Sequence, residues 1–512
     1  MGIKRYTAIK DNTITNAFQS NLSTRGTGSN AGFSDSLQVF SIYAQASSAS
    51  NEQSRILTQF PVLSSDSTSS VQIDRAAGTI PASGSVNFYL RLFNVAHDGT
   101  LPRNFTLVVS PISQSWQEGH GLDLDSYDDL TYDGTGSNWI NAAAHTVWVN
   151  NSSETLTGGS YLSASWMGAP VTDYDEFNYK STFGELGTSD IEVDITGLVE
   201  KWLASDYSNY GIGIQLTSSQ ASGNQSYYKK MFSARSSEYF FKRPIIEARW
   251  DSSRQDQRSN FYISSSALSS TDNKSTLFIY SYYRGQPKNL YHPTGEVSGA
   301  IFVTVRDITQ SVGSQTLTTT PDNPVTGGCV GTGIYTASFA LYTTSSVVYD
   351  TWWSGSSFGG TIDDSGVSVY RTGSFKLQKF DASIDYFVPR FVTNIMNLEP
   401  QYSNKASYRL RLFTRPKDWS PTIYTIASKD IENYLIEDGY YKVYRVIDQY
   451  NVIEYGTGSS KQTKLSYDSS GSYFDLDMTL LEPQYEYGIK FVYYINGLYE
   501  EQPDIFKFRV VE

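Results

Sequence analysis

The run Val86-Asn87-Phe88-Tyr89-Leu90-Arg91-Leu92 alternates apolar and polar side chains with a period of two residues. Successive side chains of a β-strand point to opposite faces, so Phe88, Leu90 and Leu92 are expected together on one buried face. Many short strands separated by turns are typical of sandwiches and barrels, so the sequence predicts an all-β protein. Similar short runs, with turn-rich spacers between them, recur at residues 56–62, 105–112, 212–216, 245–250, 277–283, 301–305, 335–342, 408–413, 440–447 and 505–511.

The composition favours the same fold class. The 512 residues include 39 Tyr, 26 Phe and 39 Gly but only 5 Met. Aromatic residues suit pleated, half-buried surfaces, and Gly suits tight turns. One short helix is predicted at residues 197–203, because Leu198 and Trp202 are four positions apart and Asp194 and Thr196 precede them as capping residues.

The length predicts about three domains. Residues 251–260 are polar and nearly free of apolar side chains, so we interpret them as a linker, and a weaker break is expected near residues 381–389. The predicted domains therefore cover residues 1–250, 261–385 and 390–512, and we expect three β-sandwich domains in series.

A short internal repeat points to the fold of the last domain. Leu-Glu-Pro-Gln-Tyr at residues 398–402 recurs at residues 481–485. Leu481, Pro483 and Tyr487 also have the spacing of a tyrosine corner, a feature of immunoglobulin-like and fibronectin type III sandwiches. The C-terminal domain is therefore predicted to be immunoglobulin/fibronectin III-like. The alternative is a chance turn before a Tyr-rich strand.

Charge, cysteine content and hydropathy limit the expected partners and the expected compartment of the protein. The net charge of −13, with scattered Lys and Arg, disfavours binding to nucleic acid. The one cysteine, Cys329, cannot form an internal disulfide, as expected for folding in a reducing cytoplasm. No apolar run follows Met1–Lys10 or approaches the ~20 residues of a membrane-spanning helix, so neither export nor membrane anchoring is predicted.

The motifs usually associated with catalysis lack their context. Residues 355–359 fit the G-x-S-x-G nucleophile elbow, but no helix-like segment follows and no histidine lies beyond His292, so we interpret them as a Gly/Ser turn. Gly-Thr-Gly-Ser-Asn at residues 26–30 recurs at residues 134–138, which indicates a favoured loop and not a dinucleotide fingerprint. No zinc site is expected from four histidines that lie far apart in the sequence, His97, His120, His145 and His292.

An acidic stretch at residues 123–133 contains the candidate metal ligands. Asp123, Asp125 and Asp128, with Asp129 and Asp133 beside them, supply the hard oxygen donors that Ca²⁺ prefers, although their spacing is not that of an EF-hand. The alternative is a solvated acidic loop.

Neither a catalytic residue nor a cofactor is predicted. No pair among the 52 acidic residues stands out as a glycosidase pair. Five tryptophans within or beside apolar runs are expected in the core, not on a sugar-binding surface: Trp116, Trp139, Trp148, Trp202 and Trp250.

Eight short segments occur in a fixed order within the first 250 residues: Ala8–Ile14, Asn30–Gly32 with Leu37 and Val39, Arg55–Phe60, Ile80–Pro81 before Val86–Leu92, Ser115–Gly119, Gly158–Gly159 after Trp148, Val193–Val199 with Trp202, and Arg243–Ile245. Together they resemble the extracellular β-sandwich modules of the DNRLRE family, which are relatives of carbohydrate-binding modules. The resemblance implies a jelly-roll-like first domain. The chain departs from the family in lacking an export signal and in its acidic insert at residues 123–133.

From Met1–Phe18 to Leu481–Glu512, the whole chain also resembles the uncharacterised virion structural proteins of large contractile-tailed phages that infect marine bacteria. This resemblance implies a non-enzymatic virion protein of the neck, tail or baseplate region, assembled in the host cytoplasm. Its expected partners are other virion proteins and copies of itself. The alternative function is a host-surface adhesin or fibre component that binds polysaccharide through the first domain.

Tyrosines of the C-terminal domain are expected to anchor these contacts, because tyrosine buries a large area and keeps a polar group. The alternative is that they form ordinary cross-strand pairs. The candidates are Tyr440, Tyr441, Tyr444, Tyr493 and Tyr494.

Overall fold

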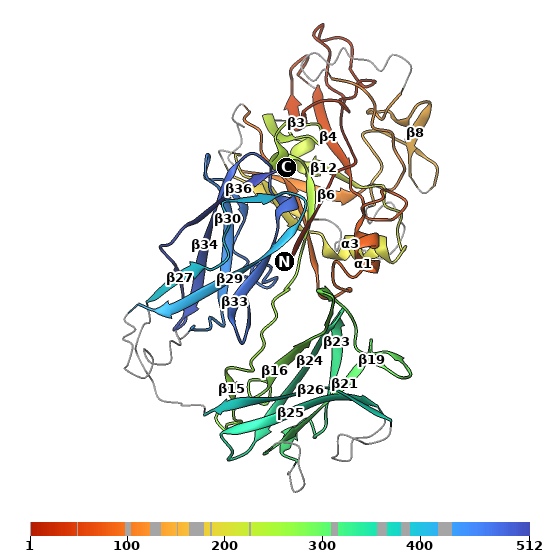
Figure 1. The fold of residues 1–512 in the computed structure, drawn as a ribbon. Helices are drawn as coiled ribbons and strands as arrows, with labels where there is room; N and C mark the ends of the chain where they lie inside the picture. Colours follow the sequence, from red (N-terminus) through yellow and green to blue (C-terminus); the bar gives the residue numbers. More distant parts are fainter. Residues whose placement is uncertain are drawn as a thin grey trace. The chain divides into compact units, whose positions relative to one another are not determined.

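The computed structural model describes residues 2–48, 50–97, 104–122, 135–150, 152–162, 179–184, 187–224, 227–308, 316–355, 366–379, 390–417 and 433–512. The chain divides into two compact units, one of residues 2–251 with 458–462 and one of residues 252–457 with 463–512. In both units nearly all of the regular secondary structure is β-strand (Figure 1). This confirms the predicted all-β class. Within the described residues, every helix is too short or too polar to cross a membrane.

The first unit is a sandwich of two sheets. The smaller sheet has the order β1-β14-β5-β11, with β1 Ile3–Thr7, β14 Ile245–Arg249, β5 Asn87–Leu92 and β11 Ile191–Asp194. The larger sheet has the order β10-β6-β12-β4-β3-β13, with β10 Tyr179–Phe183, β6 Phe105–Pro111, β12 Ile212–Leu216, β4 Asn51–Gln59, β3 Ser36–Tyr43 and β13 Tyr227–Ser233, and β2 Lys10–Thr15 pairs with β4. Side chains from both sheets share one buried core.

Strand β5 shows why the sandwich forms. Phe88, Leu90 and Leu92 are fully buried in the core between the sheets, whereas the intervening residues are only half-buried. The predicted alternation is therefore confirmed. The predicted helix is also present as α3 Thr196–Leu203, which buries Leu198 and Trp202. Other short helices are α1 Val71–Ala76, α4 Ser218–Ala221 and the 3₁₀ turn η3 Phe240–Lys242.

A second apolar cluster in the first unit contains Leu57 of β4, whose neighbour Ile56 belongs to the main core. Adjacent strand residues point to opposite faces, so the larger sheet is buried on both faces. The covering layer includes a small sheet of β7 Asn141–Ala143, β8 Thr146–Val149 and β9 Thr155–Leu156, and it contributes Trp116, Trp139 and Trp148. These three, Trp202 and Trp250 are all buried, as predicted.

A buried carboxylate on the smaller sheet is surrounded by arginines. Glu247 of β14 lies 2.7 Å from Arg5 and from Arg249, and 3.4 Å from Arg91. Burial alone would raise the pKa of Glu247, but the positive charges of Arg5, Arg91 and Arg249 lower it to about 2. The ion pairs cross from β1 through β14 to β5, so they tie three strands together.

The N-terminal half of the second unit is built around one sheet of order β15-β26-β25-β21-β23-β24-β16. Strand β21 pairs with both β23 and β25, so this sheet is continuous, and its strands enclose a common core that includes Val303, Tyr335 and Trp352. The bounds are β15 Phe261–Tyr262, β26 Val367–Gln378, β25 Val347–Gly355, β21 Ala300–Arg306, β23 Val325–Gly331, β24 Ile334–Tyr342 and β16 Ser275–Tyr280, with β22 Thr318–Thr320 beside β24.

Two small hairpins belong to the same half. They are β17 Tyr282–Tyr283 with β18 Gln286–Pro287, and β19 Tyr291–His292 with β20 Gly295–Glu296.

The boundary between the two units falls at Asp251 and Ser252, within the predicted linker at residues 251–260, but the second half of this segment is packed into the second unit. Asp256, Arg258 and Asn260 are buried. Arg258 donates two hydrogen bonds of 2.8 Å to Asp350 on β25, and the backbone N–H of Asp256 donates to the carbonyl oxygen of Tyr467. Polar composition did not indicate exposure here, because the polar groups are satisfied by buried partners.

The C-terminal half of the second unit contains a four-stranded and a six-stranded sheet. One has the order β27-β29-β33-β32, with β27 Phe391–Ile395, β29 Ser407–Pro416, β33 Gly471–Asp477 and β32 Ser466–Asp468. The other has the order β28-β36-β34-β30-β31, with β28 Gln401–Ser403, β36 Phe506–Val511, β34 Glu486–Ile495, β30 Gly439–Arg445 and β31 Asn451–Ile453, and β35 Leu498–Glu501 pairs with β34.

The predicted tyrosine corner is present in this half. The Tyr487 hydroxyl donates a 2.7 Å hydrogen bond to the carbonyl oxygen of Glu482, just after the 3₁₀ turn η4 Met478–Leu480. Strand β28 also pairs in parallel with β36, the last strand. A corner tyrosine of this kind is typical of immunoglobulin-like sandwiches. The hydrogen bond expected from the spacing of Leu481, Pro483 and Tyr487 is therefore present.

Candidate functional site

The predicted calcium ligands Asp123, Asp125 and Asp128 lie outside the described residues. Among the residues that are described, no group of three or more His, Cys, Asp or Glu side chains could hold a metal ion. Cys329 is half-buried and unpaired with another cysteine. Ser356 to Gly359 of the G-x-S-x-G pattern also fall outside the described part. Gly355 ends β25, and the next described element is strand β26, not a helix.

Four of the five tyrosines predicted as interface anchors are not available for contacts. Tyr440, Tyr441, Tyr444 and Tyr493 are buried in the C-terminal half, and only Tyr494 is exposed. The Tyr441 ring stacks on Phe474 with centroids 4.3 Å apart, and the Tyr493 hydroxyl hydrogen-bonds with Thr393. The prediction is wrong for these four, because they lie on covered parts of β30 and β34, whereas Tyr494 lies near the exposed end of β34.

The residues that carry the DNRLRE resemblance pack against one another. Arg55 donates a 2.6 Å hydrogen bond to the carbonyl oxygen of Gly158, and its guanidinium group lies over the rings of Trp139 and Tyr161. These contacts of the Arg55 side chain join β4 to the segments that contain Trp139 and Gly158. Arg55 therefore positions the loop that contains Gly158.

Glu118 of the Trp-x-Glu-Gly turn has a similar role. It accepts two hydrogen bonds from Arg235, at 2.6 and 2.7 Å, and one from the backbone N–H of Asp11 at 2.8 Å. Both of its carboxylate oxygens are therefore in use within the fold. The turn ties the start of the chain to a segment near the end of the first unit.

Exposed aromatic side chains occur instead on the two small hairpins of the second unit. Tyr282, Tyr283 and Tyr291 are 57%, 56% and 67% exposed. The cationic groups of Arg284 and Lys288 lie 5.2 and 5.1 Å from the Tyr283 ring. We refer to Tyr282, Tyr283 and Tyr291 as the hairpin tyrosines. Nothing in the sequence distinguished them from the buried tyrosines, because all lie in similar short runs.

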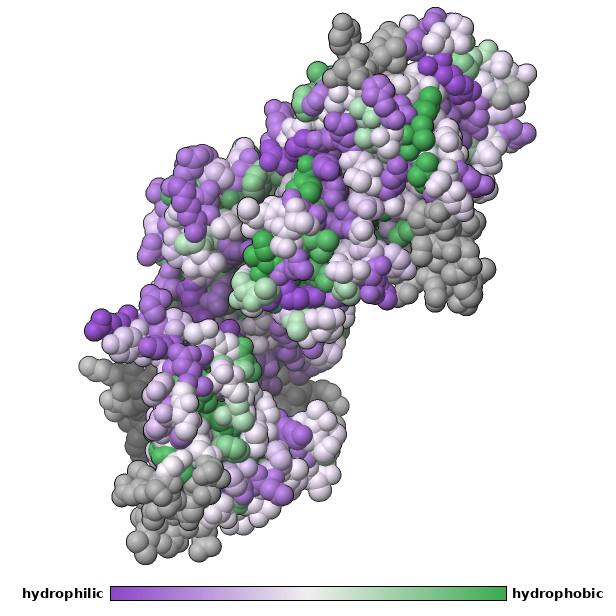
Figure 2. All heavy atoms as spheres, turned by 90° about the vertical axis from the view of Figure 1, so that its right-hand side faces the viewer, coloured by the Kyte–Doolittle hydropathy of each residue, from purple (hydrophilic) through white to green (hydrophobic). Residues whose placement is uncertain are grey.

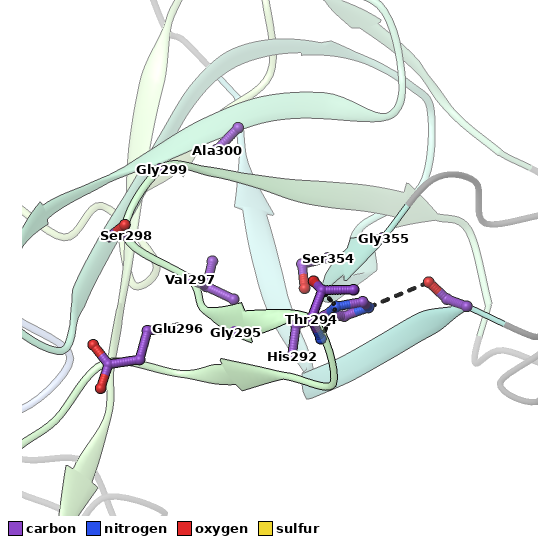
Figure 3. A pocket seen from close by; sticks show the side chains of 11 residues that line it. His292, Thr294, Gly295, Glu296, Val297, Ser298, Gly299, Ala300, Ser354 and Gly355 are labelled. Atoms are coloured by element: carbon purple, nitrogen blue, oxygen red, sulfur yellow. Dashed lines mark hydrogen bonds between the residues drawn. The ribbon is translucent and has the colours of Figure 1, made fainter.

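A cavity of about 570 Å³ lies beside β19 and β20. Figure 3 shows His292, Thr294 and Ser354 gathered at one end, while the carboxylate of Glu296 points away from them. The His292 Nδ1 atom lies 2.7 Å from the Thr294 hydroxyl, and Nε2 lies 3.3 Å from the carbonyl oxygen of Gly366. The remaining described lining is mainly glycine and other small residues: Gly295, Val297, Ser298, Gly299, Ala300 and Gly355.

A hydrogen-bond chain connects this cavity to a hairpin tyrosine. The Tyr370 hydroxyl lies 2.6 Å from the Ser354 hydroxyl and donates to the carbonyl oxygen of Tyr291 at 3.4 Å. Small polar side chains and exposed backbone next to aromatic rings suit a polar ligand such as a sugar or a peptide. Glu296 is the single carboxylate among the described lining residues, whereas glycoside cleavage needs a facing pair.

A second cavity of about 550 Å³ lies in the first unit, beside α1 and α3. Its charged side chains already pair with one another. Arg75 donates two hydrogen bonds to Glu200, at 2.8 and 2.6 Å, and Lys201 donates to Asp206 at 2.9 Å. We therefore regard the cavity lined by His292 as the better candidate. Figure 2 shows one face of the molecule, on which apolar residues lie in separate small patches among polar ones.

No protein-family model matches the chain, and no curated protein matches it. Among solved structures it is similar to a marsupial T cell receptor, at 8% identity and a TM-score of 0.15, over 46% of this chain and 68% of that one. It is also similar to Escherichia coli alpha-2-macroglobulin in its native and trypsin-activated forms, at 9% and 10% identity and TM-scores of 0.16. These matches cover 94% and 83% of this chain but only 20% and 30% of the macroglobulin chains.

Proposed function

We propose that this protein is a non-enzymatic structural component of a tailed-phage particle, in the neck, tail or baseplate region, assembled in the host cytoplasm. Its partners are other virion proteins and copies of itself. The resemblance of the whole chain to phage virion proteins and the all-β, multi-sheet architecture support this proposal.

The observation that carries the proposal is an aromatic tip on the β34–β35 hairpin. Tyr494, Leu498 and Tyr499 are 45%, 67% and 50% exposed, and the two tyrosine rings lie 4.8 Å apart. Asn496 and Gly497 both have positive φ, as a tight hairpin turn requires. A rigid hairpin that presents large apolar side chains loses little entropy on binding, so it suits a protein–protein contact.

Light scattering on the full chain tests this role, alongside mass spectrometry of purified phage particles. We expect a defined oligomer and a symmetric copy number in the particle. The triple variant Tyr494→Ser/Leu498→Ser/Tyr499→Ser should shift the oligomer to monomer. The control Tyr239→Ser, at another exposed tyrosine, should leave the oligomer unchanged. A monomeric protein that is absent from particles would overturn the proposal. Repeating the scattering with a Ca²⁺ chelator tests the predicted aspartate ligands.

The second candidate function is a host-surface polysaccharide-binding adhesin or fibre component. The specific observation that favours it is Tyr291, which is 67% exposed and directly precedes His292 in the lining of the 570 Å³ cavity. Tyrosine rings stack on sugar rings, and the small polar lining offers hydrogen bonds to hydroxyl groups.

A glycan array probed with the full chain tests the adhesin. Binding that is lost in Tyr291→Ala but kept in Tyr239→Ala would place the glycan at Tyr291. Absence of binding to any glycan would rule this function out and leave the virion role unaffected. The two candidates are therefore distinguished by different hairpins and different assays.

A further inference from the structure

Lys230 is an unusual lysine in the first unit. It lies on β13 and is fully buried. Its ammonium nitrogen lies 2.6 Å from the side-chain oxygen of Asn94 and 2.7 Å from the carbonyl oxygen of Ser189, and it also donates to the carbonyl oxygen of Gly187. Lysine is almost never fully buried unless it is paired, and no carboxylate oxygen is among these three acceptors.

Aromatic rings enclose the same nitrogen. The Nζ atom lies 4.8 Å from the Phe183 ring centroid and 5.1 Å from that of Phe232. The carboxylate that acts on this lysine is Asp190, which also accepts a 2.7 Å hydrogen bond from the backbone N–H of Asn94. A buried lysine and a half-buried asparagine are thus brought together beside an apolar core, with the exposed Asp190 hydrogen-bonded to the asparagine backbone.

We propose that Lys230 and Asn94 are joined by an intramolecular isopeptide bond. The neutral Nζ amine attacks the side-chain carbonyl carbon of Asn94, and the Nζ–Cγ bond forms as the Cγ–Nδ2 bond breaks. The side-chain amide nitrogen of Asn94 leaves as ammonia, and it takes up the proton that Nζ gives away. Asp190 carries this proton from Nζ to the leaving group. The step exchanges one amide for another, so it needs no oxidant or co-reactant.

The geometry and environment favour this reaction. The C=O bond adds about 1.2 Å to the measured 2.6 Å contact, so Cγ lies within about 3.8 Å of Nζ, close to an attack distance. Burial lowers the pKa of Lys230 to about 8, against a weaker opposing effect of Asp190, so a larger fraction of the amine is neutral and nucleophilic near neutral pH.

The bond would lock the segment that follows β5 onto β13, with which Asn94 already forms a backbone bridge at Phe232. Lys230 belongs to the larger sheet, and Asn94 follows β5 of the smaller sheet two residues beyond its end, 136 positions away in the chain. A covalent link at this point prevents the two segments from separating under load. Such a link suits a chain that has no internal disulfide.

Intact-mass spectrometry of the full-length protein tests the bond. We expect a mass lower than that of the sequence by one ammonia. Lys230→Arg and Asn94→Ala should each restore the full mass of their sequences. The matched control Lys229→Arg, at the next position on β13, should still lack one ammonia. A wild-type mass equal to the sequence mass would overturn the proposal.

Peptide mapping keeps the test independent of how the variants fold. Trypsin should not cleave after Lys230 in the wild-type protein, and the peptides that contain Asn94 and Lys230 should appear as one branched species. Asp190→Ala should slow formation of this species about 100-fold or more. Loss of ammonia at another asparagine, with separate Asn94 and Lys230 peptides, would refute the assignment.

Discussion

Asp350→Asn is expected to destabilise the sheet of the second unit's N-terminal half. Asp350 on β25 is fully buried, and it accepts hydrogen bonds from Arg258 at 2.8 and 2.8 Å and from the indole N–H of Trp352 at 2.7 Å. An amide has one acceptor oxygen, so asparagine cannot serve these donors equally. Arg258 would also keep its positive charge in a buried site without the carboxylate that pairs with it, and only the more distant charge of Asp256 would remain.

The magnitude follows from this geometry. Removing one partner of a buried ion pair costs about 3–5 kcal/mol, because the other charge stays desolvated. The double variant Arg258→Met/Asp350→Leu removes both charges, which by itself is often neutral or stabilising. It leaves the Trp352 indole N–H without its acceptor, at a cost of about 1–3 kcal/mol. The double variant should therefore be more stable than Asp350→Asn, and the two sites should be strongly coupled.

Hydrogen–deuterium exchange with mass spectrometry measures the effect in the full chain. Peptides from β25 and β26 report the opening free energy of this sheet. The control is Asp206→Asn, which removes the ion pair between Lys201 and Asp206. These two side chains are 44% and 47% exposed, so the variant should change the unfolding free energy by less than about 1 kcal/mol. The reasoning is refuted if Asp350→Asn behaves like this control, or if the double variant is as unstable as the single one.

Three further predictions concern stability. Tyr487→Phe should lower the unfolding free energy by about 1 kcal/mol in urea titrations, because it removes the corner hydrogen bond; an unchanged midpoint would assign the stabilisation to ring packing alone. Gly121→Ala should destabilise the first unit, since its Cβ would lie 1.7 Å from a backbone oxygen, whereas Gly184→Ala, with open space around its Cβ, should be nearly neutral in thermal unfolding. Acidification should remove the ionic stabilisation by Glu247, whose pKa is lowered to about 2 from 4.5: this contribution is complete above about pH 4.5 and is lost as the pH falls towards 2. Glu247→Gln should flatten that pH dependence.

Much of the fold could be predicted because its signals are local. The alternation at residues 86–92 appears as β5, residues 212–216 form β12, and the single predicted helix appears as α3. The tyrosine corner was also recognisable, since its residues lie within seven positions of one another and form the expected hydrogen bond. Strand pleat, helix spacing and corner geometry depend on near neighbours in the chain, so a sequence pattern is sufficient to indicate them.

The candidate site could not be predicted in the same way. Tyr291 and Tyr493 lie in similar Tyr-rich runs, yet the first is 67% exposed and the second is fully buried. The difference depends on whether a second layer covers the strand. The same holds for the larger sheet of the first unit, whose outer face is covered by a Trp-rich layer that no periodicity indicated.

The order of apolar and polar residues was enough to determine the all-β class, the faces of individual strands and the corner at Tyr487. The tertiary structure alone decided that Arg258 pairs with Asp350, 92 positions away, and that Lys230 meets Asn94, 136 positions away. From the neighbouring residues in the sequence, each of these polar side chains could equally well be exposed to solvent. Only the approach of distant strands removes water from them and supplies the partner that makes burial favourable.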